Sequence, residues 1–243
     1  MKPNFVHCFF EQSGTFKQAF RELGIYAADY DIRDDFGETN HRCDLFGQID
    51  RAYAGKTSIF EYIKQDELII AFFPCIYFNE HNVMYFCGTS FNFRALTQEE
   101  KFAKIIERAQ LRNKYYILLL KLFAICERRR LPLIVENPYN AHHYLRFNFP
   151  YKPNVIDMDR TLRGDYFKKP TQYFFINIAP GKGRSIQKVH KMEFVQDKRS
   201  SDRAGMCSVE RSMISPEYAH NFICDYILDI PSGNNVPTLF DNL

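Results

Sequence analysis

The segment ELIIAFFPCIYFN, residues 67–79, joins an apolar run over 68–72 to the sequence Phe73, Pro74, Cys75. An apolar run of this length that ends near a proline is typical of a buried strand in a parallel sheet. In open α/β sheets, ligands bind beyond the carboxyl ends of the strands. The segment therefore predicts an α/β fold with a cysteine at the edge of the sheet where ligands bind.

Apolar runs and helical patterns alternate along the rest of the chain. In chain order the pattern predicts strand 4–10, helix 15–24, strand 25–32, helix 57–65, strand 67–73, helix 98–129, strand 131–138, strand 171–178 and helix 215–228. This alternation is typical of a doubly wound, mostly parallel sheet. We therefore expect a Rossmann-like α/β fold with helices on both faces of the sheet.

Length and composition favour one domain. The chain has 243 residues, of which 46% are hydrophobic, and no linker or low-complexity tract divides it. The first ten residues lack the features of a signal peptide. The longest apolar segment, 115–126, is interrupted by Lys121 and is too short to span a bilayer. We expect a single domain over residues 1–243 in a soluble, cytoplasmic protein.

The cysteines and the charges add two further expectations. The seven cysteines are scattered, with no CxxC pair and no zinc-finger spacing, which favours free thiols, a reducing compartment and no metal site. The net charge of +3 is too small to indicate a nucleic-acid partner by itself. Residues 182–203, however, hold seven Lys/Arg against three Asp/Glu. Such a run is either a solvated loop or a surface that contacts phosphates.

Unusual polar residues follow three of the predicted strands, in the segments FFEQSG (9–14), FFPC (72–75) and VENP (135–138). Together these segments resemble the motifs of the cytosine-C5 DNA methyltransferases, in particular the compact members common in phages and mobile elements. The family's Phe-x-Gly-x-Gly-Gly turn is similar to the sequence that starts at Phe10, although Gln12 replaces the first glycine and Gly14 is kept. The turn lets the backbone approach the methionine part of S-adenosyl-L-methionine. The resemblance therefore implies that Phe10, Gln12 and Gly14 bind this cofactor.

The resemblance extends to the cofactor's nucleoside. Family members carry an acidic residue at the end of the second strand, which accepts the ribose hydroxyls, and a bulky side chain beside the adenine. Asp29 and Tyr30 stand in those places. A further Asp, which receives the adenine amino group in the family, corresponds to Asp44. We expect these three residues to complete the cofactor site.

The catalytic residues follow from two motifs. The segment that starts at Pro74 and Cys75 resembles the family's Pro-Cys-Gln-x-Phe-Ser, with Asn79 in place of the serine. In the family this cysteine attacks C6 of the target cytosine, a reaction that needs a thiolate. The Glu-Asn-Pro form of the family's Glu-Asn-Val segment begins at Glu136, which would protonate cytosine N3. We expect Cys75 and Glu136 to be catalytic, and Pro74, Asn79, Asn137 and Pro138 to contact the base.

The similarity covers residues 4–229, including a Lys-Pro-Thr segment within 164–177 and a closing helix within 210–227. Between them, residues 178–210 form only a short basic segment where larger members carry a target-recognition domain. If this segment recognises DNA, its lysines, among them Lys188 and Lys191, contact phosphates. In the alternative interpretation it is a surface hairpin with solvated charges.

The leading hypothesis is an enzyme that transfers a methyl group from S-adenosyl-L-methionine to C5 of cytosine in DNA, with the base flipped out or taken from a single strand. Two alternatives stay open. The same chemistry could act on RNA, such as tRNA, because recognition of a 2′-hydroxyl leaves no sequence motif. A methyltransferase-like binding protein without turnover is favoured by Gln12, by Phe73 and by the absence of the family's arginine-rich strand. It is disfavoured by the joint presence of Cys75 and Glu136.

Overall fold

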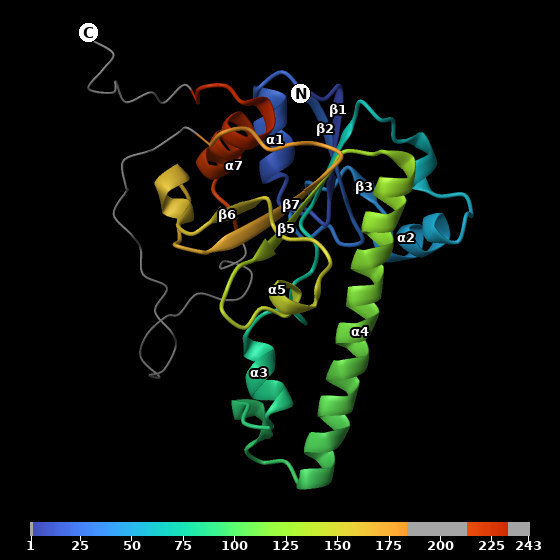
Figure 1. Ribbon diagram of the computed structural model, residues 1–243, viewed down its shortest axis with the longest axis vertical. Helices are drawn as coiled ribbons and strands as arrows, with labels where there is room; N and C mark the ends of the chain where they lie inside the picture. Colours follow the sequence, from blue (N-terminus) through green and yellow to red (C-terminus); the bar gives the residue numbers. More distant parts are fainter. Residues whose placement is uncertain (1, 184–212, 233–243) are drawn as a thin grey trace.

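The computed structural model describes residues 2–183 and 213–232, and these residues build a seven-stranded sheet (Figure 1). The strands are β1 (Phe5–Phe9), β2 (Tyr26–Asp31), β3 (His41–Arg42), β4 (Leu68–Ala71), β5 (Leu133–Pro138), β6 (Val155–Asp157) and β7 (Thr171–Ile176). Their spatial order is β3-β2-β1-β4-β5-β7-β6. Neighbours from β3 to β5 are parallel, whereas β7 is antiparallel to both β5 and β6. The predicted doubly wound, mostly parallel α/β sheet is confirmed.

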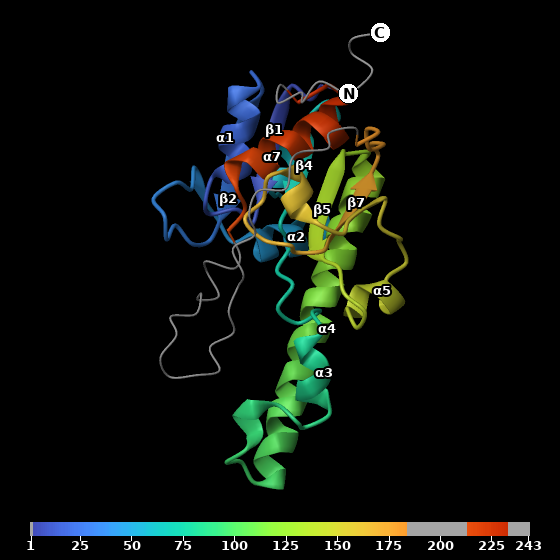
Figure 2. The ribbon, with the colours of Figure 1, turned by 90° about the vertical axis from the view of Figure 1, so that its left-hand side faces the viewer.

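Helices cover both faces of this sheet (Figure 2). The α-helices are α1 (Thr15–Glu22), α2 (Leu45–Tyr53), α3 (His81–Phe86), α4 (Gln98–Arg129), α5 (Tyr144–Asn148) and α7 (Pro216–Phe222). Single turns of 3₁₀-helix are η1 (Ile59–Tyr62), η2 (Phe91–Phe93) and η3 (Arg160–Arg163), and the π-helical turn η4 (Ile223–Leu228) continues α7. The predicted helix 57–65 is therefore reduced to one turn, and the predicted helix 215–228 changes its winding at Ile223.

Two apolar cores result from the alternation of side chains along the strands. Phe9 and Ile69 face one side, where they pack in a cluster with residues of α2 and α4. Val6 and Ile70 face the other side, in a cluster with residues of α1 and α7. Each fully buried large apolar side chain stabilises the fold by roughly 1.5–3 kcal/mol. The paired cores fix the sheet, and with it the positions of the strand ends.

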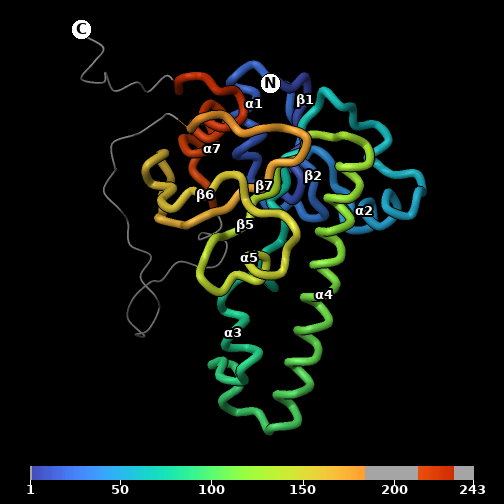
Figure 3. The backbone as a smooth tube through the Cα atoms, viewed as in Figure 1, coloured from blue at the N-terminus to red at the C-terminus, as the bar shows by residue number. Residues whose placement is uncertain are grey.

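The long helix α4 extends well beyond the sheet (Figures 1 and 3). A capping box between Thr97 and Glu100 starts the helix, and Arg130, in the left-handed conformation at φ 57°, ends it. The buried residues of α4 all lie from Leu118 onward. The first half of the helix therefore does not enter the core and instead forms an arm together with α3. No helix in the described ranges combines the length and apolarity that a bilayer span requires.

Candidate functional site

A pocket opens at the carboxyl ends of β1, β4 and β5. Its volume is about 380 Å³, which is within the usual range of ligand pockets, roughly 300–1,000 Å³. It is lined by residues that follow β1, β2 and β4, by one residue of β5, and by residues just before β7 and α7: Phe10, Glu11, Gln12, Ser13, Arg33, Asp35, Phe36, Phe72, Phe73, Pro74, Cys75, Glu136, Lys169, Met213 and Ile214. The pocket lies beyond the carboxyl ends of the strands, where ligands bind in open α/β sheets.

Cys75 reaches this pocket because β4 ends four residues earlier, at Ala71. The backbone N–H of Phe72 still donates to the carbonyl of Phe9, at 3.0 Å, so the chain leaves the sheet only after that residue. The carbonyl oxygen of Cys75 then accepts the backbone N–H groups of Phe78, at 2.8 Å, and Asn79, at 3.2 Å. This turn fixes the cysteine at the start of a hydrogen-bonded loop.

Glu136 reaches the same pocket from the neighbouring strand. Ala71 of β4 pairs with Val135 of β5, so Glu136 lies one residue beyond the last parallel pair. Its side chain is 8% exposed, and its Oε1 has no hydrogen-bond partner among the described residues. A buried carboxylate oxygen without a partner is costly and is typical of a group that serves a ligand. Cys75 and Glu136, predicted from separate motifs, therefore line one pocket.

The thiol of Cys75 is held in its protonated form. Burial, followed by the negative charge of Glu136, raises its pKa to about 11, and Lys169 acts in the opposite direction. A nucleophilic role requires the thiolate, so this site must lower the thiol pKa when substrate binds or pass the proton to a base. Lys169 is the described residue whose charge favours the thiolate.

Asn137 connects the segments that carry Cys75 and Glu136. Its side chain is fully buried, and its Nδ2 donates to the carbonyl oxygen of Phe73 at 3.1 Å. This bond holds the chain two residues before Cys75 against the end of β5. Pro138, the last residue of β5, accepts a hydrogen bond from the side-chain amide of Gln172 at 2.8 Å. Asn137 and Pro138 do not line the pocket; they support the strand that carries Glu136.

The turn between β1 and α1 contains one glycine, Gly14. Gly14 lies at φ 67° immediately before α1, in the region that glycine favours, and a Cβ there would lie 3.0 Å from Cε of Lys17. The carboxylate of Glu11 accepts the N–H groups of Phe16, at 2.7 Å, and Lys17, at 3.3 Å. It therefore occupies the amino end of α1. Burial, partly offset by these bonds, raises the pKa of Glu11 to about 7.

The residues predicted to bind the nucleoside part of the cofactor do not line the pocket. Asp29 is fully buried: it forms an ion pair with Lys17 at 3.0 Å and accepts the N–H of Asn40 at 2.7 Å. The hydroxyl of Tyr30 is 3.1 Å from Nδ1 of a histidine on β1. Asp44 caps helix α2 by accepting the N–H of its third residue at 3.1 Å. All three have structural partners of their own.

The loop after β2 supplies pocket residues that the motifs did not indicate. Arg33, Asp35 and Phe36 line the pocket. Arg33 and Asp35 form an exposed ion pair, and the ring of Phe36 is 45% exposed. The sequence gave an indirect signal, because these residues follow the acidic end of a predicted strand. A charged pair and an exposed ring beside a pocket are suited to the polar and planar parts of a nucleoside.

Arg160 is a second charged group that sequence reasoning missed. It is fully buried in η3, forms an ion pair with Asp165, and its Nη1 is 3.5 Å from the hydroxyl of Thr171. Burial alone would lower the pKa of Arg160, but the surrounding tyrosine and carboxylate groups, Glu136 among them, raise it instead. A buried guanidinium therefore lies within electrostatic range of the carboxylate of Glu136.

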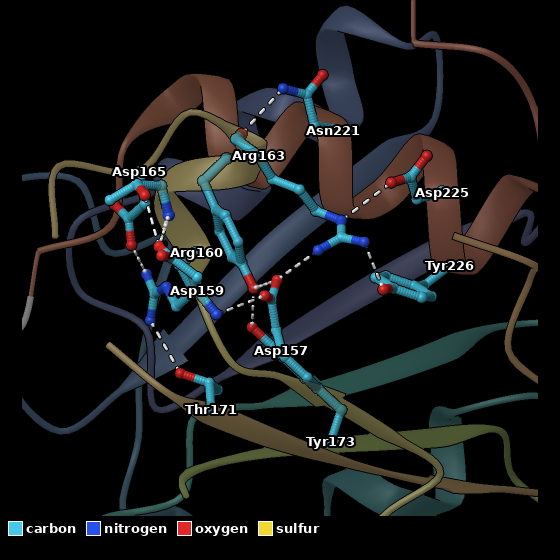
Figure 4. Close-up of polar contacts among 12 residues, drawn as sticks. Asp157, Asp159, Arg160, Arg163, Asp165, Thr171, Tyr173, Asn221, Asp225 and Tyr226 are labelled. Carbon is cyan, nitrogen blue, oxygen red and sulfur yellow. Dashed lines mark hydrogen bonds and ion pairs between the residues drawn. The ribbon is translucent and has the colours of Figure 1, made fainter. Parts of the chain in front are cut away.

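A polar cluster holds the wall of the pocket that precedes α7 (Figure 4). Asp165 accepts the N–H of Ser215 at 3.0 Å, and the hydroxyl of Ser215 donates to the carbonyl of Gly164 at 2.6 Å. Beside them Arg163 bridges Asp157, at 2.8 Å, and Asp225, at 3.0 Å. Because Met213 and Ile214 come directly before Ser215, these bonds fix the two apolar residues of the pocket wall.

Asn79, the remaining predicted residue that the structure describes, does not line this pocket. Asn79 belongs to the turn after Cys75, where its side chain accepts a hydrogen bond from Asn82 at 3.0 Å. Lys188 and Lys191 fall outside the described residues, as does most of the basic segment. Within the described ranges, no group of three or more His, Cys, Asp or Glu side chains is arranged to hold a metal ion.

The proposed function rests on the geometry of the site, because comparison with known proteins identifies no family and no relative. A scan against protein-family models finds no family that matches the chain, and a search of the curated proteins finds no relative.

Proposed function

We propose that this protein is an S-adenosyl-L-methionine-dependent methyltransferase that acts on C5 of cytosine in DNA. The observation that carries the proposal is the meeting of Cys75 and Glu136 in one pocket at the carboxyl ends of adjacent strands. A thiol and a carboxylic acid are the two groups that nucleophilic activation of a pyrimidine ring requires, one for C6 and one for N3.

The pocket fits the proposed cofactor, with a changed set of residues. Oε1 of Gln12 is buried and has no partner among the described residues, so it can accept a hydrogen bond from an ammonium group. Arg33 offers a guanidinium to a carboxylate, Asp35 offers acceptors to ribose hydroxyls, and Phe36 offers a ring face to adenine. S-adenosyl-L-methionine, when bound, supplies an electrophilic methyl group.

The chain's own residues would carry the remaining steps. The carboxylate of Glu136 takes up the proton of the Cys75 thiol and delivers it to N3 of cytosine, while the sulfur forms a bond to C6. The electron pair displaced from the C5–C6 double bond then makes C5 the nucleophile that accepts the methyl group. Loss of the C5 proton to water, return of the N3 proton to Glu136 and cleavage of the S–C6 bond restore the aromatic ring and the thiolate. Lys169 stabilises that thiolate at the start and at the end.

The test is a methylation assay on the purified chain. The protein is incubated with S-adenosyl-L-methionine and cytosine-containing duplex DNA, single-stranded DNA or tRNA, and the nucleosides are then analysed by mass spectrometry for 5-methylcytosine. We expect product from the wild-type protein, none from Cys75→Ala, and wild-type yield from the matched variant Cys43→Ser. Product in undiminished yield from Cys75→Ala would refute the mechanism.

The same assay separates the alternatives. Product on tRNA alone would move the substrate class to RNA. The enclosure of Asp29 by Lys17 favours the binding-protein alternative, because it removes the acidic residue on which the family's ribose site depends. Calorimetric titration with S-adenosyl-L-methionine decides that point. Binding that is lost in Gln12→Ala would support the cofactor site described here, whereas no binding at millimolar ligand would support a protein without turnover.

A further inference from the structure

A second pocket lies between α3, α4 and α5 and borders the turn that begins at Cys75. Its volume is about 490 Å³. Tyr77, Phe78 and Asn79 line it, and two of these residues donate their backbone N–H groups to the carbonyl of Cys75. One hydrogen-bonded turn of the chain therefore links the wall of the second pocket to Cys75, the proposed nucleophile.

Aromatic rings and one guanidinium group, that of Arg112, line this pocket, and a second guanidinium, that of Arg146, lies beside the lining residue Phe147. The guanidinium of Arg112, from the arm of α4, lies 4.3 Å from the ring centroid of Phe86 and 4.6 Å from that of Tyr144. On α5, Arg146 lies 5.5 Å from the ring of Phe147, which is 72% exposed. An exposed ring next to a pocket wall is free to stack on a planar ligand.

These two guanidinium groups have no carboxylate partner. Among the described residues, no hydrogen bond or ion pair is made by the side chain of Arg112 or Arg146, whereas Arg160 and Arg163 are each paired with aspartates. Each unpaired guanidinium keeps five N–H donors in a planar fork that suits phosphate oxygens. The pocket therefore combines stacking surfaces with uncompensated positive charge.

A buried donor completes the pocket. His143 lines the pocket and is fully buried. Its Nδ1 lies 3.2 Å from Nε2 of Gln172, and this amide nitrogen can only donate a hydrogen bond. Nδ1 is thus the acceptor of this bond. Burial lowers the pKa of His143 to about 4, so the neutral ring carries its hydrogen on Nε2. That Nε2 has no partner among the described residues. It can donate to an acceptor on the edge of a nucleobase.

We propose that this second pocket binds a single-stranded segment of nucleic acid next to the target cytosine, with a base against Phe147 and its phosphates on Arg112 and Arg146. The inference rests on the proposed function only for the identity of the target base. Stacking on an exposed ring needs an unpaired base, which favours a single strand over a duplex. Stacking tolerates any base, whereas an apolar peptide would bring no negative charge to the two arginines.

The test measures binding directly. A fluorescein-labelled 20-nucleotide oligodeoxythymidine with one central cytosine is titrated with protein, and fluorescence anisotropy is recorded over a range of salt concentrations. We expect Phe147→Ala and Arg112→Gln each to weaken binding about tenfold. Arg112→Gln should also reduce the salt slope by about 0.7, the value for one phosphate contact on a single strand.

Two variants serve as matched controls. Arg128→Gln makes the same change on the same helix, at an arginine that also stacks on a tyrosine, 5.7 Å from the ring of Tyr53. Tyr26→Ala removes an exposed ring, 78% accessible, at the start of β2 and thus at the opposite edge of the sheet. Both controls should bind like the wild type. Circular dichroism verifies that all variants are folded.

The outcomes separate this inference from the proposed function. Weak binding by the wild-type protein would overturn the inference. So would wild-type affinity in Phe147→Ala and Arg112→Gln, or losses of affinity in the controls as large as those in these two variants. Pocket-dependent binding without any methyl transfer would refute the proposed function and leave the second pocket standing. The same titration with the uridine-containing RNA equivalent identifies the type of strand; tighter RNA binding that depends on Phe147 would support the pocket and assign it to RNA.

Discussion

The side-chain amide of Asn137 donates a hydrogen bond to the carbonyl oxygen of Phe73 at 3.1 Å, across 64 residues of sequence. Phe73 comes two residues before Cys75, and Asn137 directly follows Glu136. One buried bond therefore sets the spacing between the segments that carry the two proposed catalytic groups. Few contacts of this kind are visible in a sequence, because they join the ends of two strands that become neighbours only in the folded sheet.

Replacement of Asn137 should therefore affect both stability and chemistry. Asn137→Ala leaves the buried carbonyl of Phe73 without its donor, which costs roughly 1–3 kcal/mol. Urea unfolding measures this loss. The matched variant Asn148→Ala removes a similar amide-to-carbonyl bond that is exposed, 3.0 Å from the carbonyl of Tyr144, and it should cost less than about 0.5 kcal/mol. Equal losses in the two variants would show that the bond at Phe73 has no special role.

The reactivity of Cys75 should depend on its two charged neighbours. Burial and the charge of Glu136 raise the pKa of the thiol to about 11, so alkylation by iodoacetamide at pH 7.5 should be slow. Glu136→Gln removes the carboxylate and should speed the reaction, whereas Lys169→Met removes the opposing charge and should slow it. Each pKa unit changes the thiolate fraction about tenfold in this range.

Peptide mass spectrometry follows Cys75 separately from the other thiols. The exposed Cys87 provides an internal reference in each sample, and its rate should be the same in all three proteins. A rate at Cys75 that is unaffected by Glu136→Gln would mean that the two groups do not interact across the pocket.

The sheet could be predicted because it depends on local patterns, whereas the pairing of Cys75 with Glu136 was implied by the resemblance of two strand ends to family motifs. Uninterrupted apolar runs identify the buried strands, and parallel strands bring their carboxyl ends to one edge. The predicted limits of the long helix, 98–129, match α4. Its start could be recognised from the capping box at Thr97. Its role as an arm could not, because that depends on which half of the helix finds a partner.

The residues predicted to bind the cofactor show what a motif resemblance does not reveal. Asp29 lies near the carboxyl end of β2 and in sequence looks available to a ligand, yet Lys17 of α1 forms a buried ion pair with it. In the sequence, Lys17 looks like an ordinary exposed helix residue. The pair forms only when α1 docks on the sheet, and the pocket is then completed by Arg33 and Asp35 from a loop whose sequence carries no motif.

The burial of Glu11 should make stability depend on pH. Its pKa in the folded protein is about 7, raised from the ordinary 4.5 mainly by burial. The folded state therefore binds the proton more tightly than the unfolded chain does. The resulting stabilisation is complete below the unfolded pKa and is lost as the pH rises from about 4.5 through 7. We expect wild type to lose on the order of 1–3 kcal/mol between pH 5 and pH 8 through this group.

Glu11→Gln isolates that contribution. The amide keeps one acceptor for the N–H of Phe16 but cannot ionise. Urea titrations at pH 5 and pH 8 should show a smaller change in unfolding free energy for the variant than for the wild type. Glu22→Gln, at the exposed end of the same helix, should keep the wild-type pH dependence. A steeper loss of stability in Glu11→Gln than in the wild type would contradict the assignment.

Arg163 should be costly to remove. Its guanidinium bridges Asp157 at 2.8 Å and Asp225 at 3.0 Å, and both carboxylates are buried (Figure 4). Arg163→Met removes the cation that these carboxylates share, which should cost about 3–5 kcal/mol of unfolding free energy. The exposed pair of Arg33 and Asp35 is the comparison, and Arg33→Met should cost less than about 1 kcal/mol.

A double variant tests whether the cost at Arg163 is electrostatic. In Arg163→Met, the guanidinium no longer lies between the buried carboxylates of Asp157 and Asp225, and their negative charges repel each other. Adding Asp157→Asn removes one of these two charges. The double variant should therefore lose less than the sum of the two single losses, by at least about 1 kcal/mol in urea unfolding, as coupled residues do. Strictly additive losses would mean that Arg163 stabilises the pocket wall through packing against Tyr226, 4.8 Å away, and not through its charge.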